Sequence, residues 1–168
     1  MISKAMEKAL NDQLNYETYS AYVYVAMAAH FEHQNLTGFA NWLKIQAQEE
    51  MLHATKFYNY IMQARGQVTL EAIAKPKDSW PDALTAFESV CTHEQGVTKR
   101  IYALVDLARK ESDHATEAFL QWFVTEQVQE EADPDAIVQK LKLIGDNAQG
   151  LFMIDALLGG RQAEAAPA

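Results

Sequence analysis

Apolar residues recur at spacings of three and four along four long segments of the chain, with polar residues between them. This period is typical of helices that bury one face. Ser3 and Thr37 are the expected N-caps of the first two segments, and Gly66 ends the second. Ser79 is the expected cap of the third segment, with Pro81 in its first turn. The pattern predicts four helices, over about 4–33, 38–65, 80–110 and 114–144.

The C-terminal half of the chain adds three expectations. Pro134 falls inside the fourth segment, where a proline removes one backbone hydrogen bond and costs about 3 kcal/mol, so we expect a kink or break near 132–134. A short fifth helix is predicted over about 148–158, and the tail 161–168 is expected to be disordered. Residues 1–160 are then expected to form one domain.

The lengths of the connections predict how the helices are arranged. Only a few residues join the first helix to the second and the third to the fourth, so each pair should be an antiparallel hairpin. The link from Gln67 to Trp80 is longer and can stretch to about 46 Å, which matches the roughly 42 Å length of the second helix. The sequence therefore predicts an all-α four-helix bundle with one long crossover.

Polar residues interrupt the apolar face of every long helix near its middle, about 20 Å from the helix start. Residues three apart share a helix face, so the polar residues of one segment should point the same way. Midpoints keep their height whichever way a helix runs, and we therefore expect the interruptions to meet at one level. They are Glu17, Gln46, Glu50, His53, Glu94, Gln127 and Glu130.

Four glutamates gathered in an apolar core would repel one another and lose hydration worth several kcal/mol each. A single one could reach solvent or pair with a lysine, but four coincident interruptions favour a pair of divalent cations between the helices. The ligands are mostly oxygen with one imidazole and no thiolate, which suits iron or manganese better than structural zinc. Zinc is still expected to bind as a competitor. A pair of iron ions in such a site can deliver two electrons to dioxygen together, so oxidation of Fe(II) is the expected reaction.

Composition excludes several other classes of protein. The 168 residues carry a net charge of −9 without a basic patch, so nucleic acid is not an expected partner. The longest apolar run, 19–29, is shorter than the roughly 20 residues that cross a bilayer, and no membrane association is expected. The N-terminal segment lacks the pattern of an export signal and Cys91 is the single cysteine, which together predict a cytoplasmic protein without disulfides.

Four stretches of the chain resemble the bacterial non-haem ferritins: LNYETYSAYVY, AQEEMLHA, HEQ and LQWFVTEQVQEE. The resemblance covers nearly the whole length of the chain, including the crossover and the fifth helix. Ferritin-like proteins are four-helix bundles in which glutamates and Glu-x-x-His motifs bind two irons. The resemblance implies that one iron is held by Glu17, Glu50 and His53, and a second by Glu50, Glu94 and Glu130.

The resemblance also implies roles for residues beside the two irons. Gln127 should lie next to the second iron and bond an oxygen species or water. Tyr24 should bond near the site and supply an electron, or simply pack there with its hydroxyl on Glu94. Trp122 is a further possible reductant, although a packing role is the stronger expectation. Independently of the resemblance, His93 lies outside the apolar face of its helix and is expected to have a surface or capping role rather than to bind metal.

A third iron site in such ferritins would draw here on Glu49, Glu126, Gln129 and Glu130. The sequence departs from the pattern at Gln129, where a glutamate is usual, and a neutral amide is a weaker ligand than a carboxylate. The site is therefore expected to be weak, shifted or absent. An equally good interpretation makes Glu49 and Glu126 part of a solvated acidic face.

Assembly and storage follow from the resemblance alone: 24 copies would form a hollow shell that keeps Fe(III) as mineral after oxidation by O2 or H2O2. Haem is not expected, because the fourth segment lacks the second E-x-x-H of bacterioferritins, although Met51 stands at their haem-ligand position. Two alternatives stay open. One is a di-iron oxidase or oxygenase acting on an organic substrate, and the other is a DNA-protecting mini-ferritin with ligands from two subunits.

Overall fold

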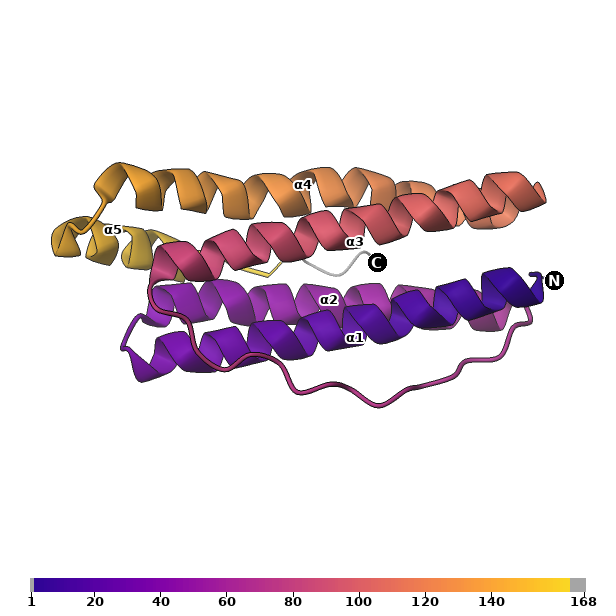
Figure 1. Cartoon of the computed structure of the whole chain (residues 1–168), viewed down its shortest axis with the longest axis horizontal. Helices are drawn as coiled ribbons and strands as arrows, with labels where there is room; N and C mark the ends of the chain where they lie inside the picture. Colours follow the sequence, from indigo (N-terminus) through magenta and orange to yellow (C-terminus); the bar gives the residue numbers. More distant parts are fainter. Residues whose placement is uncertain (1, 164–168) are drawn as a thin grey trace.

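Helices make up nearly all of the regular structure in the computed structural model, which describes residues 2–163. Figure 1 shows α1 beside α2 and α3 beside α4, with the crossover running the length of the bundle and α5 at one end. The predicted four-helix bundle with one long crossover is confirmed. The helices are α1 (Lys4–His33), α2 (Thr37–Gln63), α3 (Ala83–Glu111), α4 (His114–Ile144) and α5 (Ala148–Gly159).

The crossover is held along α1 by two asparagines one turn apart. Asn11 donates its side-chain amide to the carbonyl of Gln67 (2.9 Å) and accepts from the backbone N–H of Thr69 (2.7 Å). Asn15 repeats the pattern with the Thr69 carbonyl (2.9 Å) and the N–H of Glu71 (2.8 Å). These amides provide the partners that backbone groups outside regular structure otherwise take from water. The long connection is therefore fixed against one helix.

The N-terminus of α2 differs from the prediction. Thr37 was expected as its cap, but the cap position is Leu36, which offers no side-chain hydrogen bond. The carboxylate of Asp155 in α5 accepts instead from the N–H groups of Gly38 (2.8 Å) and Phe39 (3.0 Å). A Cβ on Gly38 would lie 1.7 Å from the carbonyl oxygen of Asp155. A residue far away in sequence thus caps α2, and the glycine lets α5 come close enough to do so.

The start of α3 was also predicted too early, at Trp80 with Ser79 as cap. The helix begins later, because Asp82 accepts from the N–H of Thr85 (2.6 Å) and so supplies the cap. Trp80 instead packs in the core before the helix starts, and its indole N–H donates to the hydroxyl of Ser89 (3.1 Å).

A kink or break was expected at Pro134. The break is wrong, since α4 continues through this residue without interruption, and the kink stays a prediction. Pro134 is buried, and the apolar side chains of Phe123, Ile137 and Leu141 are buried on both sides of it. Burying such side chains contributes about 1.5–3 kcal/mol each, which together exceeds the roughly 3 kcal/mol cost of an internal proline.

The chain after α5 bears on the expected disordered tail. Arg161 is an exception to that expectation, because its side chain is bound to the backbone and side chains of α2. Gln162 and Ala163 are exposed and lie outside the helices, and residues 164–168 of the expected tail lie outside the described residues.

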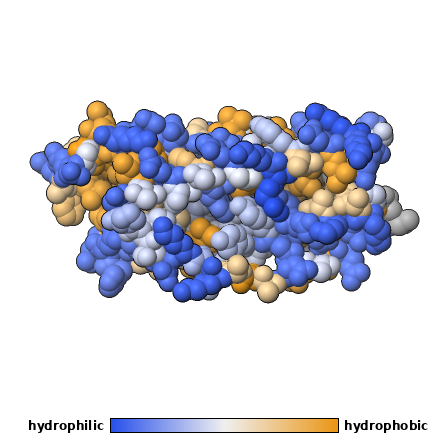
Figure 2. Space-filling view, in the orientation of Figure 1, coloured by the Kyte–Doolittle hydropathy of each residue, from blue (hydrophilic) through white to orange (hydrophobic). Residues whose placement is uncertain are grey.

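Two separate apolar clusters fill the bundle, one at each end. The first joins α1, α2, α3, α4 and α5 around residues such as Phe31, Phe39 and Phe87. The second joins the other halves of the long helices around Leu10, Phe57 and Ile101. Apolar side chains also reach the surface at the α5 end (Figure 2). Within residues 2–163 no helix is long and apolar enough to cross a membrane, and the cytoplasmic location stays a prediction.

Candidate metal centre

A layer of buried polar side chains separates the two apolar clusters at mid-height in the bundle. Each of the polar residues that were predicted to meet there is at most 7% exposed, and all four long helices contribute. They are Glu17 from α1, Gln46, Glu50 and His53 from α2, Glu94 from α3, and Gln127 and Glu130 from α4. The two apolar clusters lie on either side of this layer along the bundle.

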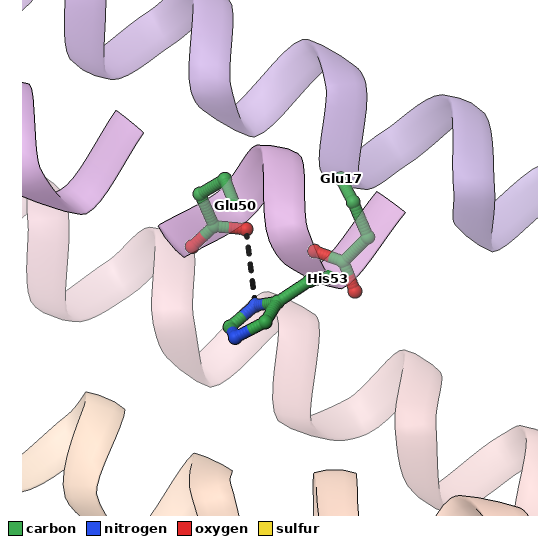
Figure 3. A group of neighbouring side chains, drawn as sticks. All are labelled: Glu17, Glu50 and His53. Carbon is green, nitrogen blue, oxygen red and sulfur yellow. Dashed lines mark ion pairs between the residues drawn. The ribbon is translucent and has the colours of Figure 1, made fainter. Parts of the chain in front are cut away.

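Helical spacing aims these side chains at one another. Glu50 and His53 are three residues apart and leave α2 on the same face. Figure 3 shows the Glu50 carboxylate facing the His53 ring, with the carboxylate of Glu17 from the neighbouring α1 close to both. His53 Nδ1 lies 3.7 Å from Glu50 Oε2.

Among the described residues, three groups of three side chains have ligand atoms close enough to hold a metal ion, and two of these groups consist of residues of the buried layer alone. In Glu17, Glu50 and His53 one ligand atom of each lies within 4.8 Å of the others. The same holds for Glu50, Glu94 and Glu130. Glu50 belongs to both of these groups.

The carboxyl groups are electrostatically costly in the absence of a cation. Burial raises the pKa of Glu17 and of Glu50 well above the usual range, and neighbouring carboxylates raise both further. Burial raises the pKa of Glu94 to about 7, although the hydrogen bond from Tyr24 opposes this shift. Burial and then the charge of Glu94 raise the pKa of Glu130 to about 8. A carboxylate in such a site gains most from a partner that carries positive charge.

Hydrogen bonds within the layer do not give every carboxylate oxygen a partner. One carboxylate oxygen each of Glu17, Glu50 and Glu94 is buried and has no hydrogen-bond partner among the described residues. Buried polar atoms are nearly always paired, so three orphaned oxygens in one layer call for an explanation. Cations that prefer oxygen ligands with one imidazole, such as iron, fit both the donor set and the orphaned atoms.

Comparison with known proteins gives the same answer. Residues 7–144 match the family model described as a ferritin-like domain. The chain belongs to the ferritin family. It is 43% identical over 161 residues to a bacterial non-heme ferritin of Bacteroides fragilis, covering 96% of this chain and all of that one. A bacterial non-heme ferritin of Staphylococcus aureus is 40% identical over 161 residues, 96% of this chain and 97% of the other.

Solved structures agree closely with this ferritin. An open pore ferritin from the archaeon Archaeoglobus fulgidus superposes with a TM-score of 0.96 at 48% identity, over 96% of this chain and 99% of that one. A humanized archaeal ferritin gives a TM-score of 0.97 at 47% identity, over 98% of this chain and all of the other. Family membership and the buried carboxylate layer together support iron storage as the function of the chain, with iron bound by the protein.

Two amides that surround the carboxylates of this ferritin have roles that sequence reasoning missed. Gln13 donates to Glu17 Oε1 (2.8 Å), and Gln46 donates to Glu130 Oε2. Gln13 precedes Glu17 by one helical turn, as Gln46 precedes Glu50, and this spacing was the available signal. Both amides stabilise the ionised form of their partner, which is the form that binds metal.

Tyr24 and Gln127 both contact Glu94. The Tyr24 hydroxyl donates to Glu94 Oε1, as the packing interpretation of this residue predicted, and burial raises the pKa of the phenol well above its usual value. The Gln127 side-chain nitrogen donates to the Glu94 carbonyl (3.3 Å) and to Thr98 Oγ1 (3.2 Å). Gln127 is therefore held beside the second group through its own hydrogen bonds.

The residues of the expected third site are only partly brought together. Ligand atoms of Glu126 and Glu130 lie within 4.8 Å of each other and of His53, which the prediction did not include. Glu49 is paired with Arg161 (2.7 Å), and Gln129 is exposed and donates to Asp133.

Two further aromatic residues lie near the layer. Trp122 is 40% exposed, packs edge-on to His53 with ring centres 5.4 Å apart, and carries the ammonium of Lys56 over its ring. His93, for which a surface or capping role was expected, is half-buried. Its ring stacks on Tyr16 and its Nε2 lies 2.7 Å from Ser20 Oγ, and burial lowers its pKa to about 4.

Proposed function

We propose that the buried layer is a ferroxidase centre that binds two Fe(II) ions per chain and oxidises them with O2 or H2O2. Glu17, Glu50 and His53 would hold one ion, and Glu50, Glu94 and Glu130 the other. The observation that carries the proposal is the set of three buried carboxylate oxygens without hydrogen-bond partners, one in each of Glu17, Glu50 and Glu94. Two divalent cations would satisfy all three and offset the repulsion between the carboxylates.

The reaction needs two electrons to leave the site together. Each Fe(II) gives up one electron, and O2 takes both with two protons to form H2O2. With H2O2 as the oxidant, two electrons and two protons give two molecules of water. Because Glu94 and Glu130 have pKa values of about 7 and 8, Fe(II) binding at neutral pH displaces protons from them into the site or solvent.

Tyr24 and Gln127 act on this step from beside the ligands. The Tyr24 hydroxyl fixes the carboxylate of Glu94, and its phenol is an oxidisable group in direct contact with a proposed ligand. Gln127 presents a polar amide at the same side, where it can orient an oxygen molecule or water.

Storage of the insoluble Fe(III) product requires an enclosed space that one bundle does not offer. We propose that copies of the chain, 24 by analogy with ferritin shells, enclose a cavity in which the mineral forms. Apolar side chains that a single chain leaves uncovered support assembly: Phe152, Met153 and Leu157 on α5 are each more than half exposed. Contiguous apolar surface of this kind is typical of protein contacts.

The alternatives of the sequence analysis fit the geometry less well. A di-iron enzyme acting on an organic substrate needs space beside the metals, but Phe57 and Phe123 are buried there with ring centres 4.4 Å apart. A DNA-protecting mini-ferritin takes its ligands from two subunits, whereas both groups of three ligands come from this one chain.

Aerobic titration with Fe(II), followed by absorbance of the Fe(III) product, tests the proposal. The wild-type chain should show a fast phase that saturates at two irons per chain. Glu50→Ala removes the residue shared by both groups and should abolish that phase. Glu88→Ala, which removes a half-exposed glutamate paired with Lys142 on the bundle surface, is the matched control and should keep it. A fast phase of unchanged size in Glu50→Ala would show that the centre is assigned to the wrong residues.

A further inference from the structure

The arginine that follows α5 is bound across the middle of α2. Arg161 donates from Nη1 to the carbonyl of Trp42 (3.2 Å) and to Gln46 Oε1 (3.0 Å), and from Nη2 to Glu49 Oε2 (2.7 Å). Its guanidinium also lies over the indole of Trp42, 4.5 Å from the ring centre. A planar guanidinium held at this many points has one orientation.

One of these contacts reaches the metal centre through a second side chain. Gln46 is 1% exposed, and its side-chain nitrogen donates to Glu130 Oε2. A side-chain amide accepts only through its oxygen and donates only through its nitrogen, while a guanidinium only donates. Arg161 therefore requires the Gln46 oxygen to face it, and this places the Gln46 nitrogen toward Glu130. Reversal of the amide would set two donors against each other at Arg161 and two acceptors at Glu130.

A second contact engages a carboxylate beside the centre. Glu49 precedes Glu50 on α2, and its charge is close enough to contribute to the raised pKa of Glu130. Its side chain is only 16% exposed in the ion pair with Arg161. A partly buried ion pair with a short charged hydrogen bond is stronger than an ordinary surface pair.

We propose that Arg161 is a positioning residue of the metal centre, which orients Gln46 toward Glu130 and keeps Glu49 from acting as a metal ligand. The inference rests on the proposed function, since it assumes that Glu130 binds the second ion. Arg161 then has two separable effects. It supports the second site through Gln46, and it limits the chain to two cations by neutralising Glu49, which would otherwise join Glu126 and Glu130 in holding a third.

Titration with Co(II), which is not oxidised under these conditions, measures both effects without any turnover. Wild type should bind two Co(II) per chain. Arg161→Ala should bind a third, more weakly, and its affinity for the second should fall by about tenfold, because residues that orient metal ligands typically contribute this much. Arg161→Lys keeps the charge but loses the fork, so it should bind two Co(II) while the second still binds more weakly.

A double variant separates the two effects. Glu49→Gln combined with Arg161→Ala should return the count to two without restoring the affinity for the second ion. Far-UV circular dichroism checks that every variant keeps the helical content of wild type. The inference is overturned if Arg161→Ala matches wild type in both the number and the affinity of bound Co(II). Wild type that binds fewer than two Co(II) would overturn the proposed centre itself, and this inference with it.

Discussion

Replacing Glu130 with glutamine tests the electrostatic account of the buried layer in the metal-free chain. Glutamine has nearly the same shape and its carbonyl can still accept from Gln46, but it cannot ionise. The folded chain raises the pKa of Glu130 from 4.5 to about 8, first through burial and then through the charge of Glu94. The folded chain thus binds this proton more tightly than the unfolded chain does.

The sign of the effect on stability follows directly. Between about pH 4.5 and pH 8 the unfolded chain has released the proton and the folded chain has kept it, so the free energy of unfolding falls as the pH rises. With the two pKa values of 4.5 and about 8, Glu130 lowers that free energy by about 3 kcal/mol at pH 7 and by about 1 kcal/mol at pH 5. Glu130→Gln removes the titration, so its gain in stability should be about 2 kcal/mol larger at pH 7 than at pH 5.

Thermal unfolding of chelator-treated protein at the two pH values measures this difference. For a chain of this size, 1 kcal/mol shifts the midpoint by about 2–4 °C, so the variant should gain roughly 4–8 °C more at pH 7 than at pH 5. Glu88→Gln, which replaces a half-exposed carboxylate on the bundle surface in the same conservative way, is the matched control. Excess Co(II) should reverse the order at pH 7, because metal stabilises only a chain that binds it.

The reasoning would be refuted by equal gains of Glu130→Gln at pH 5 and pH 7. That result would mean that Glu130 keeps its ordinary pKa in the folded chain, and therefore that water reaches the layer. A loss of stability in the variant at both pH values would show that the carboxylate has a structural partner of its own.

Two further changes test features around the centre. Asp155→Ala removes the acceptor for the N–H groups of Gly38 and Phe39, so the free energy of unfolding measured by denaturant titration should fall by about 1–2 kcal/mol. Asp155→Asn should lose less, because its side-chain oxygen can still accept these hydrogen bonds. Equal losses in both variants would contradict the capping role. Tyr24→Phe removes a hydrogen bond that lowers the pKa of Glu94. The pH at which Co(II) binding is half-maximal should therefore rise by roughly one unit. An unchanged midpoint would mean that Glu94 does not bind the ion.

Much of the candidate site could be predicted from the sequence, because each of its buried polar residues lies near the middle of a long helix. Midpoints stay at one level whichever way the helices run, so the four buried glutamates meet there: Glu17, Glu50, Glu94 and Glu130. Apolar residues before and after each glutamate turn the same face of its helix into the bundle. The spacing of Glu50 and His53 likewise fixes a common face. Local pattern and helix geometry were sufficient for these positions.

What the sequence did not reveal depends on contacts between residues far apart in the chain. Thr37 carries a good local capping signal, but Asp155 reaches the same N–H groups from another helix. The tail at Arg161 has the composition of a disordered segment, yet one side chain finds three acceptors on α2. Pro134 shows the same competition, since packing on both sides outweighs a local penalty. Short-range signals carry no information about such partners.

The division of the apolar interior into two clusters affects which mutations the fold tolerates. Because each end of the bundle is packed independently of the acidic layer, a chain that lost Glu50 or His53 by mutation would still fold and present the same outer surface to its neighbours. The polar layer and the scaffold around it can therefore be altered separately by mutation.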